Sequence, residues 1–325
     1  MSSSSREGFG PILAFDLGGT QLRVGLVTAK GKVIDRVIEP TRSEEGPKRL
    51  IERIDGLGKA LAQKNRKGRP AAVAAAVASP LDNRGTLHYP PNLKGWKTVA
   101  FKGMLASHFK MPVAMGNDAT VAALGEHVFG DGRGVDDLVY LTVSTGIGGG
   151  VITGGQLLTG AWGMAGELGH IFIAPEGPLG KCGHRGCLES LACGEAITLR
   201  ARLAMKAGRA TSLSKVPQAA LTTKDVFTAA AAGDAFAKEL IQAVATDLGR
   251  GIASLVHVFN PRKVILGGGV TKSWEMIEPV VEKTVHGLLM PGFIGRLEIV
   301  RTRFGDDIGL LGATALAVRE LGIKK

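Results

Sequence analysis

The sequence predicts an α/β protein built from two similar halves, because glycine-rich turns repeatedly follow short apolar strands. An apolar run at residues 12–15 leads into Asp-Leu-Gly-Gly-Thr at 16–20 and then into a second apolar run at 22–27. The uncharged run 138–143 leads in the same way into the glycine-rich segment 144–150. Strand, glycine turn and strand is the pattern of a β-hairpin. Each half is therefore expected to begin with a hairpin.

The first half alternates strands with helices. Its expected helix at 47–63 places Leu50, Ile51 and Ile54 on one face, as an amphipathic helix does. The expected elements of this half are strands at 12–15, 22–27 and 33–38, the helix at 47–63, strands at 72–78 and 112–115, and a helix at 119–129.

The second half repeats this arrangement, although the identity between the halves is too low to establish a duplication. A third glycine turn, at 267–269, again follows a strand. The expected elements are strands at 138–143, 151–152 and 156–158, a helix at 235–259 that ends before Pro261, a strand at 263–266 and a closing helix at 307–320.

The composition is that of a soluble protein with room for two domains, at 325 residues, 45% hydrophobic and 21% charged. No apolar run approaches the roughly 20 residues of a membrane span, so no membrane partner is expected. Residues 1–10 lack the apolar core of a secretion signal. We expect a disordered leader there and a cytoplasmic protein.

The net charge of +11 comes from dispersed Lys and Arg residues, and only 5% of the residues are aromatic. This distribution indicates no nucleic-acid surface, because base stacking needs clustered aromatic side chains. The positive field favours anionic substrates such as nucleotides or polyphosphate.

The turn at 16–20 has two interpretations. Gly18 and Gly19 would let backbone amides approach a phosphate, and Asp16 could hold a phosphate-bound Mg²⁺. The alternative is an ordinary hairpin turn. A Rossmann site is disfavoured because the chain continues as strand rather than helix after Thr20, and no P-loop motif occurs.

Polar side chains at several turns offer further chemistry. Asp118, between a strand and a helix, is either a helix cap or a general base, and Asn117 could orient the same substrate. Glu167, His170 and Glu189 could bind sugar hydroxyls, although each alone is more often a surface or capping residue.

The three cysteines lie within residues 182–193, and an odd count indicates no disulfide framework. Cys182 and Cys187, with His170 and His184, have spacing suited to tetrahedral Zn²⁺, or are plain buried thiols. Cys193 is expected on a helix, as a small packing residue.

Together these motifs resemble the ROK family of sugar kinases, within the hexokinase/actin-like superfamily, from Ile12 to about Leu321. The resemblance implies a two-lobed actin-like/hexokinase (ribonuclease H-like) fold with ATP and sugar in an interlobe cleft. The motifs that carry it, in order, are DLGGT at 16–20, PNL at 91–93, GNDA at 116–119, STGIGGG at 144–150, GELGH at 166–170, GHRGCLE at 183–189 and LGGGV at 266–270.

The resemblance also implies roles for individual residues. Asp118 is the expected catalytic base for the sugar 6-hydroxyl, and His170 would use one ring nitrogen for sugar and the other for zinc. The implied sugar contacts are Asn92, Asn117, Asp118, Glu167, His170 and Glu189. The implied contacts with the nucleotide, its phosphates and Mg²⁺ are Asp16, Gly18, Gly19, Thr20, Thr145, Gly146, Gly268 and Gly269.

The domains follow by the same resemblance. Residues 11–118 with about 305–325 are expected to form a small α/β domain, and residues 119–304 a large one with the zinc loop and a dimer surface.

Two positions depart from the family pattern. The first zinc cysteine is replaced by Gly180, which leaves His170, Cys182 and Cys187. The fourth ligand is then His184 or water, or zinc is absent. The second is Ser79, which stands where a glycine is common, near the expected sugar pocket, and would add or remove a hydroxyl contact.

The sequence therefore predicts a glucokinase that uses ATP and Mg²⁺, and the family resemblance implies a homodimer, possibly a tetramer. The alternatives are a kinase for N-acetylmannosamine, mannose or fructose, or a polyphosphate-dependent glucokinase. A sugar-responsive repressor is disfavoured, because only 15 residues precede Asp16, too few for a helix-turn-helix domain.

Overall fold

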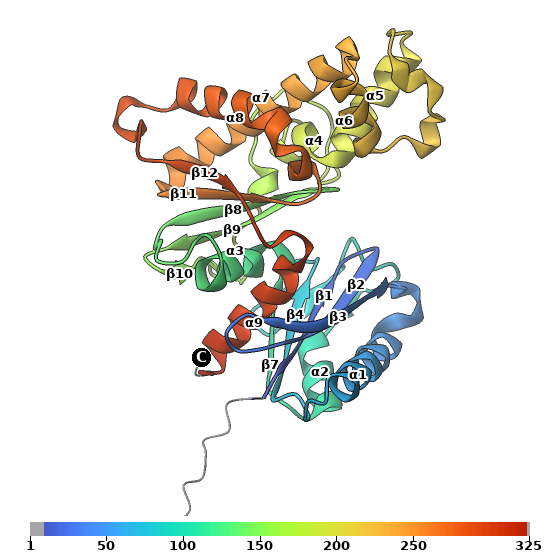
Figure 1. Ribbon diagram of the computed structural model, residues 1–325, viewed down its shortest axis with the longest axis vertical. Coiled ribbons are helices and arrows are strands. Elements are labelled where there is room, and N and C mark those ends of the chain that lie inside the picture. The colour runs from blue at the N-terminus through green and yellow to red at the C-terminus, as the bar shows by residue number, and fades with distance from the viewer. Residues whose placement is uncertain (1–9, 324–325) are drawn as a thin grey trace, which may run out of the picture. The chain divides into compact units, whose positions relative to one another are not determined.

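A computed structural model describes residues 10–323 of the chain, so the expected leader lies outside the described residues except for Gly10. The chain divides into two compact units (Figure 1). Unit 1 comprises Met1–Gly134, Leu157–Ala165 and Asp306–Lys325, and unit 2 comprises Val135–Gln156 and Gly166–Gly305. In the described part of the chain, every helix is too short or too polar to cross a membrane.

Unit 1 is built on a mixed five-stranded sheet with the strand order β3-β2-β1-β4-β7. The first two pairings are antiparallel and the next two are parallel. The strands are β1 Ile12–Leu17, β2 Gln21–Val27, β3 Val33–Pro40, β4 Ala72–Val77 and β7 Val113–Asn117.

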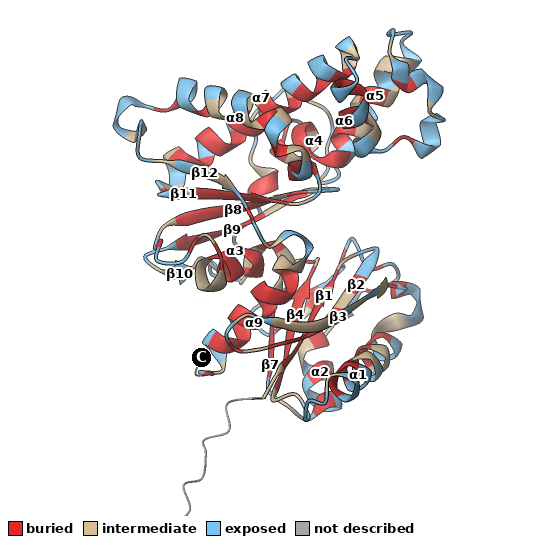
Figure 2. Cartoon of the chain, viewed as in Figure 1, coloured by how far each residue is buried: buried red, intermediate tan, exposed pale blue. Residues whose placement is uncertain are grey.

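The two faces of this sheet are covered by different helices, as the side-chain alternation of its strands requires. Leu13 and Phe15 of β1 join a core with α1 (Gly46–Lys64) and α2 (Phe101–Phe109). On the other face, Gly25 of β2 lies against Leu310 of α9 (Ile308–Glu320). The strand β4 is buried along its whole length (Figure 2), and its small alanines let the helices pack closely.

The helix α3 (Asp118–Phe129) packs on α9 and so belongs to unit 1. The sequence analysis assigned residues 119–304 to the large domain. The domain boundary between residues 118 and 119 stays a prediction.

Unit 2 repeats the sheet pattern of unit 1, with the order β10-β9-β8-β11-β12. The pair β8–β9 is antiparallel, and β8–β11 and β11–β12 are parallel. The strands are β8 Leu138–Val143, β9 Ile147–Thr153, β10 Gln156–Leu157, β11 Lys263–Gly267 and β12 Glu298–Arg301. The helices are α4 Leu188–Ala192, α5 Gly194–Lys206, α6 Thr223–Ala231, α7 Ala235–Phe259 and α8 Trp274–Leu288.

Two expectations are corrected by the structure. Strand β9 begins at Ile147, so the glycines at 148–150 lie in a strand and only residues 144–146 form the turn. Cys193 lies between α4 and α5 rather than on a helix, and its Sγ accepts a hydrogen bond from the Ala196 N–H at 3.3 Å. It caps α5 because its backbone is extended there.

Candidate functional site

The parallel strands of unit 1 end in one row. Leu17, Val77 and Asn117 are register partners across β1, β4 and β7. Residues that follow these strands therefore emerge at the same edge of the sheet, the edge where α/β sheets bind ligands. This places the 16–20 turn and Asp118 at one edge.

The first glycine turn presents free backbone amides. Gly19 and Thr20 are exposed, and Gly18 closes the turn by donating its N–H to the Gln21 carbonyl at 3.0 Å. Within residues 10–323, the amides of Gly19 and Thr20 donate to no protein acceptor. Successive unpaired N–H groups form a site for an anion, which supports the phosphate interpretation of this turn.

Asp16 stands directly before this turn and is held by Arg23, its cross-strand partner on β2. The Arg23 Nη1 donates to Asp16 Oδ2 at 3.1 Å. Burial raises the pKa of the Asp16 carboxyl, and the nearby Arg23 opposes this rise. A β-carbon on Gly309 would lie 2.6 Å from the Asp16 carboxylate, so only a glycine there leaves room for it.

Asn117 is the residue that caps α3. Its Oδ1 accepts hydrogen bonds from the Thr120 N–H at 3.0 Å and the Thr120 hydroxyl at 3.1 Å. Asp118 is the first residue of the helix, so the capping interpretation of Asp118 is wrong. The cap is made by the side-chain oxygen of Asn117.

Asn92 lies in the loop between the short strands β5 (Leu87–His88) and β6 (Thr98–Val99). Its amide donates to the Ala78 carbonyl at 3.1 Å, which ties the loop to the same sheet edge. Ser79 is buried and its hydroxyl donates to the Pro80 carbonyl at 3.0 Å. While it makes that bond, the Ser79 hydroxyl can contact a sugar only as an acceptor.

The second glycine turn, in unit 2, has the same character. The amides of Thr145 and Gly146 have no acceptor in the described part of the chain. Glu189 supports the turn, because its Oε2 accepts a hydrogen bond from the Ile147 N–H at 2.9 Å. A β-carbon on Gly146 would lie 2.4 Å from the same oxygen.

Glu167 and His170 join Glu189 to form a polar group in unit 2. The His170 Nε2 lies 3.9 Å from Glu167 Oε2. Burial raises the pKa of Glu167, His170 opposes the rise, and the Glu189 carboxylate adds to it. These acceptors are suited to a ligand that brings hydroxyl donors.

Gly268 and Gly269 follow β11 beside the end of β8. Gly268 has a φ of 92°, and a β-carbon there would lie 2.4 Å from the Val143 carbonyl oxygen. The backbone therefore needs glycine at this position. Gly269 is exposed, and a β-carbon there would have the Ser144 hydroxyl oxygen as its nearest neighbour, at 3.7 Å.

The side chains of His170, Cys182 and Cys187 meet in one group, with ligand atoms within 4.8 Å of one another. The two sulfur atoms are 3.8 Å apart, and the His170 Nδ1 is buried without a partner among the described residues. His184 lies outside this group, with its Nδ1 3.1 Å from the Cys182 carbonyl oxygen. Burial raises the pKa of the Cys193 thiol to about 11, so this residue stays protonated.

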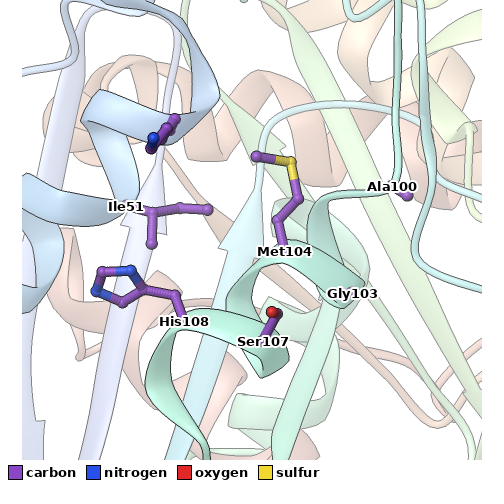
Figure 3. Close-up of a pocket in the computed structure, with 7 residues that line it drawn as sticks. Ile51, Ala100, Gly103, Met104, Ser107 and His108 are labelled. Atoms are coloured by element: carbon purple, nitrogen blue, oxygen red, sulfur yellow. The ribbon is translucent and has the colours of Figure 1, made fainter.

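A cavity of about 510 Å³ lies between α1 and α2, lined by Ile51, Met104, Ser107 and His108 among others (Figure 3). Its lining includes none of the residues at the strand ends. It is therefore separate from the candidate site.

Arg23 was missed by the sequence analysis, although the hairpin offered a signal. Residues 16 and 23 are equally distant from the turn, so an antiparallel pairing makes them partners. Asp307, which pairs with Arg36 at 2.6 Å near the start of α9, had no comparable signal.

Residues 12–320 match the ROK family. The chain belongs to the ROK family. It is 37% identical over 314 residues to a glucokinase of Thermotoga maritima, covering 96% of this chain and 98% of that protein. The crystal structure of a ROK family glucokinase from Streptomyces griseus, in complex with glucose and AMPPNP, matches with a TM-score of 0.81 and 30% identity, covering 94% of this chain and 99% of that one.

A ROK family transcriptional regulator, a homologue of the Escherichia coli MLC protein, gives a TM-score of 0.85 at 28% identity. It covers 94% of this chain and 77% of that one. The ROK fold of this chain is thus the two-lobed actin-like/hexokinase fold that the sequence predicted.

The capping role of Asn117 at α3 can be tested separately from its expected role as a sugar contact. Asn117→Ala should lower the free energy of unfolding by about 1 kcal/mol, because the Thr120 amide loses its acceptor. Asn117→Asp keeps the acceptor and loses only the 3.4 Å bond from the Asn117 amide to the Ser79 carbonyl, so it should be destabilised less than Asn117→Ala. Equal destabilisation by both substitutions would contradict the capping role.

Proposed function

We propose that the chain is an ATP-dependent glucokinase, which transfers the γ-phosphoryl group of ATP to the 6-hydroxyl of glucose. The products are glucose 6-phosphate and ADP. The observation that carries the proposal is the pair of glycine turns whose amides have no protein acceptor among the described residues, each beside a polar side chain suited to a sugar. The full-length similarity to glucokinases supports glucose as the acceptor.

Asp118 is the proposed general base. It is the first residue of α3 and directly follows the row of strand ends. A carboxylate at this position can accept the proton of the 6-hydroxyl while that oxygen attacks phosphorus.

The glycine turns are the proposed phosphate sites, with Gly18, Gly19 and Thr20 in one and Thr145 and Gly146 in the other. Backbone amides stabilise the charge that spreads over the phosphoryl oxygens during transfer. Gly268 and Gly269 are the proposed nucleotide contacts. Asp16 fits Mg²⁺, a cation that prefers carboxylate oxygens together with substrate phosphates and neutralises their charge.

The proposed sugar contacts are Asn92, Asn117, Glu167, His170 and Glu189. Glu167 and Glu189 offer acceptors for the hydroxyl donors of a sugar. The Asn92 side-chain amide donates one hydrogen bond to the Ala78 carbonyl, and the Asn117 side-chain amide donates one to the Ser79 carbonyl. Polyphosphate as donor is the alternative that the net charge of +11 favours. A homodimer or tetramer, and residence in the cytoplasm, stay predictions.

We also propose that His170, Cys182 and Cys187 hold a structural Zn²⁺. The unpartnered Nδ1 of His170 and the adjacent sulfurs are a fitting donor set. A β-carbon on Gly180 would lie 3.1 Å from the Cys187 sulfur and 3.3 Å from the Cys182 sulfur. Position 180 thus faces the place where a fourth ligand would lie, and the bound ion would cross-link this loop to His170.

Gly180→Cys should tighten zinc binding, because it completes a set of four protein ligands. We expect about one zinc ion per chain in both proteins, retained by the variant at chelator concentrations that strip the wild type. Elemental analysis after dialysis measures this. Cys193→Ser is the matched control and should not change the zinc content. Zinc-free wild type and variant would refute the site.

Asp118→Asn should lower kcat for glucose phosphorylation by about 10²–10⁴-fold, because the general base is lost. The dissociation constant for glucose, measured calorimetrically, should stay close to that of the wild type. Asp55→Asn is the control and should retain turnover, because it removes a carboxylate on α1 that pairs with Lys59 of α1 and His108 of α2. Near-wild-type turnover in Asp118→Asn would exclude Asp118 as the base.

A further inference from the structure

Residues 41–43 link the first glycine turn to the loop that carries Asn92. This segment follows β3 directly, and both Thr41 and Ser43 are buried, with 1% and 4% of their surface exposed. Neither residue belongs to a motif that the sequence analysis singled out. Their burial reflects hydrogen bonds to the two neighbouring segments.

Thr41 holds the glycine turn at both of its ends. Its hydroxyl donates to the Gly18 carbonyl at 2.6 Å, and its backbone N–H donates to the Thr20 carbonyl at 2.9 Å. The two bonds fix the carbonyl groups of the turn. The amides of Gly19 and Thr20 are left without a protein acceptor among the described residues.

Ser43 holds the Asn92 loop through two further hydrogen bonds. Its hydroxyl accepts from the Lys94 N–H at 3.0 Å, and its carbonyl accepts from the Trp96 indole N–H at 2.8 Å. Trp96 is itself buried and packs edge-on against Phe101 of α2, with ring centroids 5.3 Å apart. The loop is thereby anchored to the core of unit 1.

The segment between these two anchors is short and fixed. Arg42 adopts a left-handed backbone conformation with a φ of 52°, which a non-glycine residue keeps only where its surroundings hold it. Arg53 of α1 donates from Nη2 to the Thr41 carbonyl and from Nη1 to the Pro40 carbonyl.

The two held segments also touch each other. A β-carbon on Gly19 would lie 3.1 Å from both the β-carbon and the carbonyl oxygen of Asn92. The Gly19 backbone and Asn92 are thus close neighbours, with little room for a side chain between them. Segment 41–43 sets the spacing between a phosphate site and a sugar contact.

We infer that Thr41 and Ser43 are positioning residues, which brace the first phosphate turn against the sugar loop in the geometry needed for phosphoryl transfer. This inference rests on the proposed kinase function. Transfer needs the attacking oxygen and the phosphorus in line, and small misplacements of either cost rate steeply.

Thr41→Val removes the hydroxyl and keeps the side-chain shape. We expect kcat to fall by about tenfold to a hundredfold, with the KM for ATP changed more than the KM for glucose. Thr41→Ser keeps the donor and should restore kcat. Thr314→Val is the matched control, because the buried Thr314 hydroxyl donates to the Leu310 carbonyl within α9 and touches neither segment.

Ser43→Ala removes the acceptor for the Lys94 amide and should raise the KM for glucose more than the KM for ATP. In the double variant Thr41→Val/Ser43→Ala, kcat/KM should fall by less than the product of the two single losses. The reason is that both substitutions disturb the same spacing between the turn and the loop. Thr41→Val that is folded and keeps wild-type kcat, or a loss that Thr314→Val reproduces, would overturn the inference.

Amide hydrogen exchange keeps this test separate from that of the proposed function. In Thr41→Val, peptides covering residues 16–22 should exchange faster than in the wild type. Peptides covering residues 90–97 should also exchange faster than in the wild type. If Thr41→Val exchanges faster and the wild type shows no turnover, the kinase proposal is refuted, but the positioning role of Thr41 stands. If Thr41→Val exchanges at the wild-type rate and the wild type is active, only the positioning role of Thr41 is refuted.

Discussion

At the ends of β1 and β8, a glycine backbone lies directly against a side chain that we propose to bind the sugar. Gly19 adjoins Asn92 and Gly146 adjoins Glu189, with no space for a β-carbon between Gly146 and its neighbour and little for one at Gly19. In each unit, this close approach places a proposed phosphate turn next to a proposed sugar contact. The parallel strands that follow each hairpin bring the remaining polar residues to the same sheet edge.

This arrangement removes the Asp16 carboxylate from water and partly desolvates Glu167, half of whose side chain stays exposed. Burial raises the pKa of both Asp16 and Glu167, and in each case a basic neighbour, Arg23 or His170, opposes the rise. A carboxylate held charged in a poorly solvated place interacts strongly with any cation or hydroxyl that enters. The desolvation that is unfavourable in the free protein therefore favours ligand binding.

The sequence analysis predicted the elements with an uninterrupted apolar pattern and missed others, including two helices of unit 2. The hairpins and α7 follow from apolar periodicity and turn glycines. The helix α8 was missed because Pro279 interrupts it, and α6 was missed although Thr222 and Asp225 form a capping box.

Candidate site residues divide in the same way. Motif spacing put Asp16 directly before the first glycine turn, but the proximity of Asn92 to Gly19 and of Glu189 to Gly146 came only from the structure. The sequence analysis offered Asp118 as a possible cap because the helix was expected to begin at residue 119, whereas the helix begins at Asp118 and Asn117 is the capping residue. Thr41 was invisible because its partner, Gly18, lies 23 residues away in the chain.

The most direct test of the account is kcat/KM of the purified chain for glucose and for N-acetylmannosamine, with ATP and polyphosphate in turn as donors. The account predicts the highest value for glucose with ATP, with glucose 6-phosphate as product. A higher value for N-acetylmannosamine or for polyphosphate, or no transfer to any hexose, would contradict it.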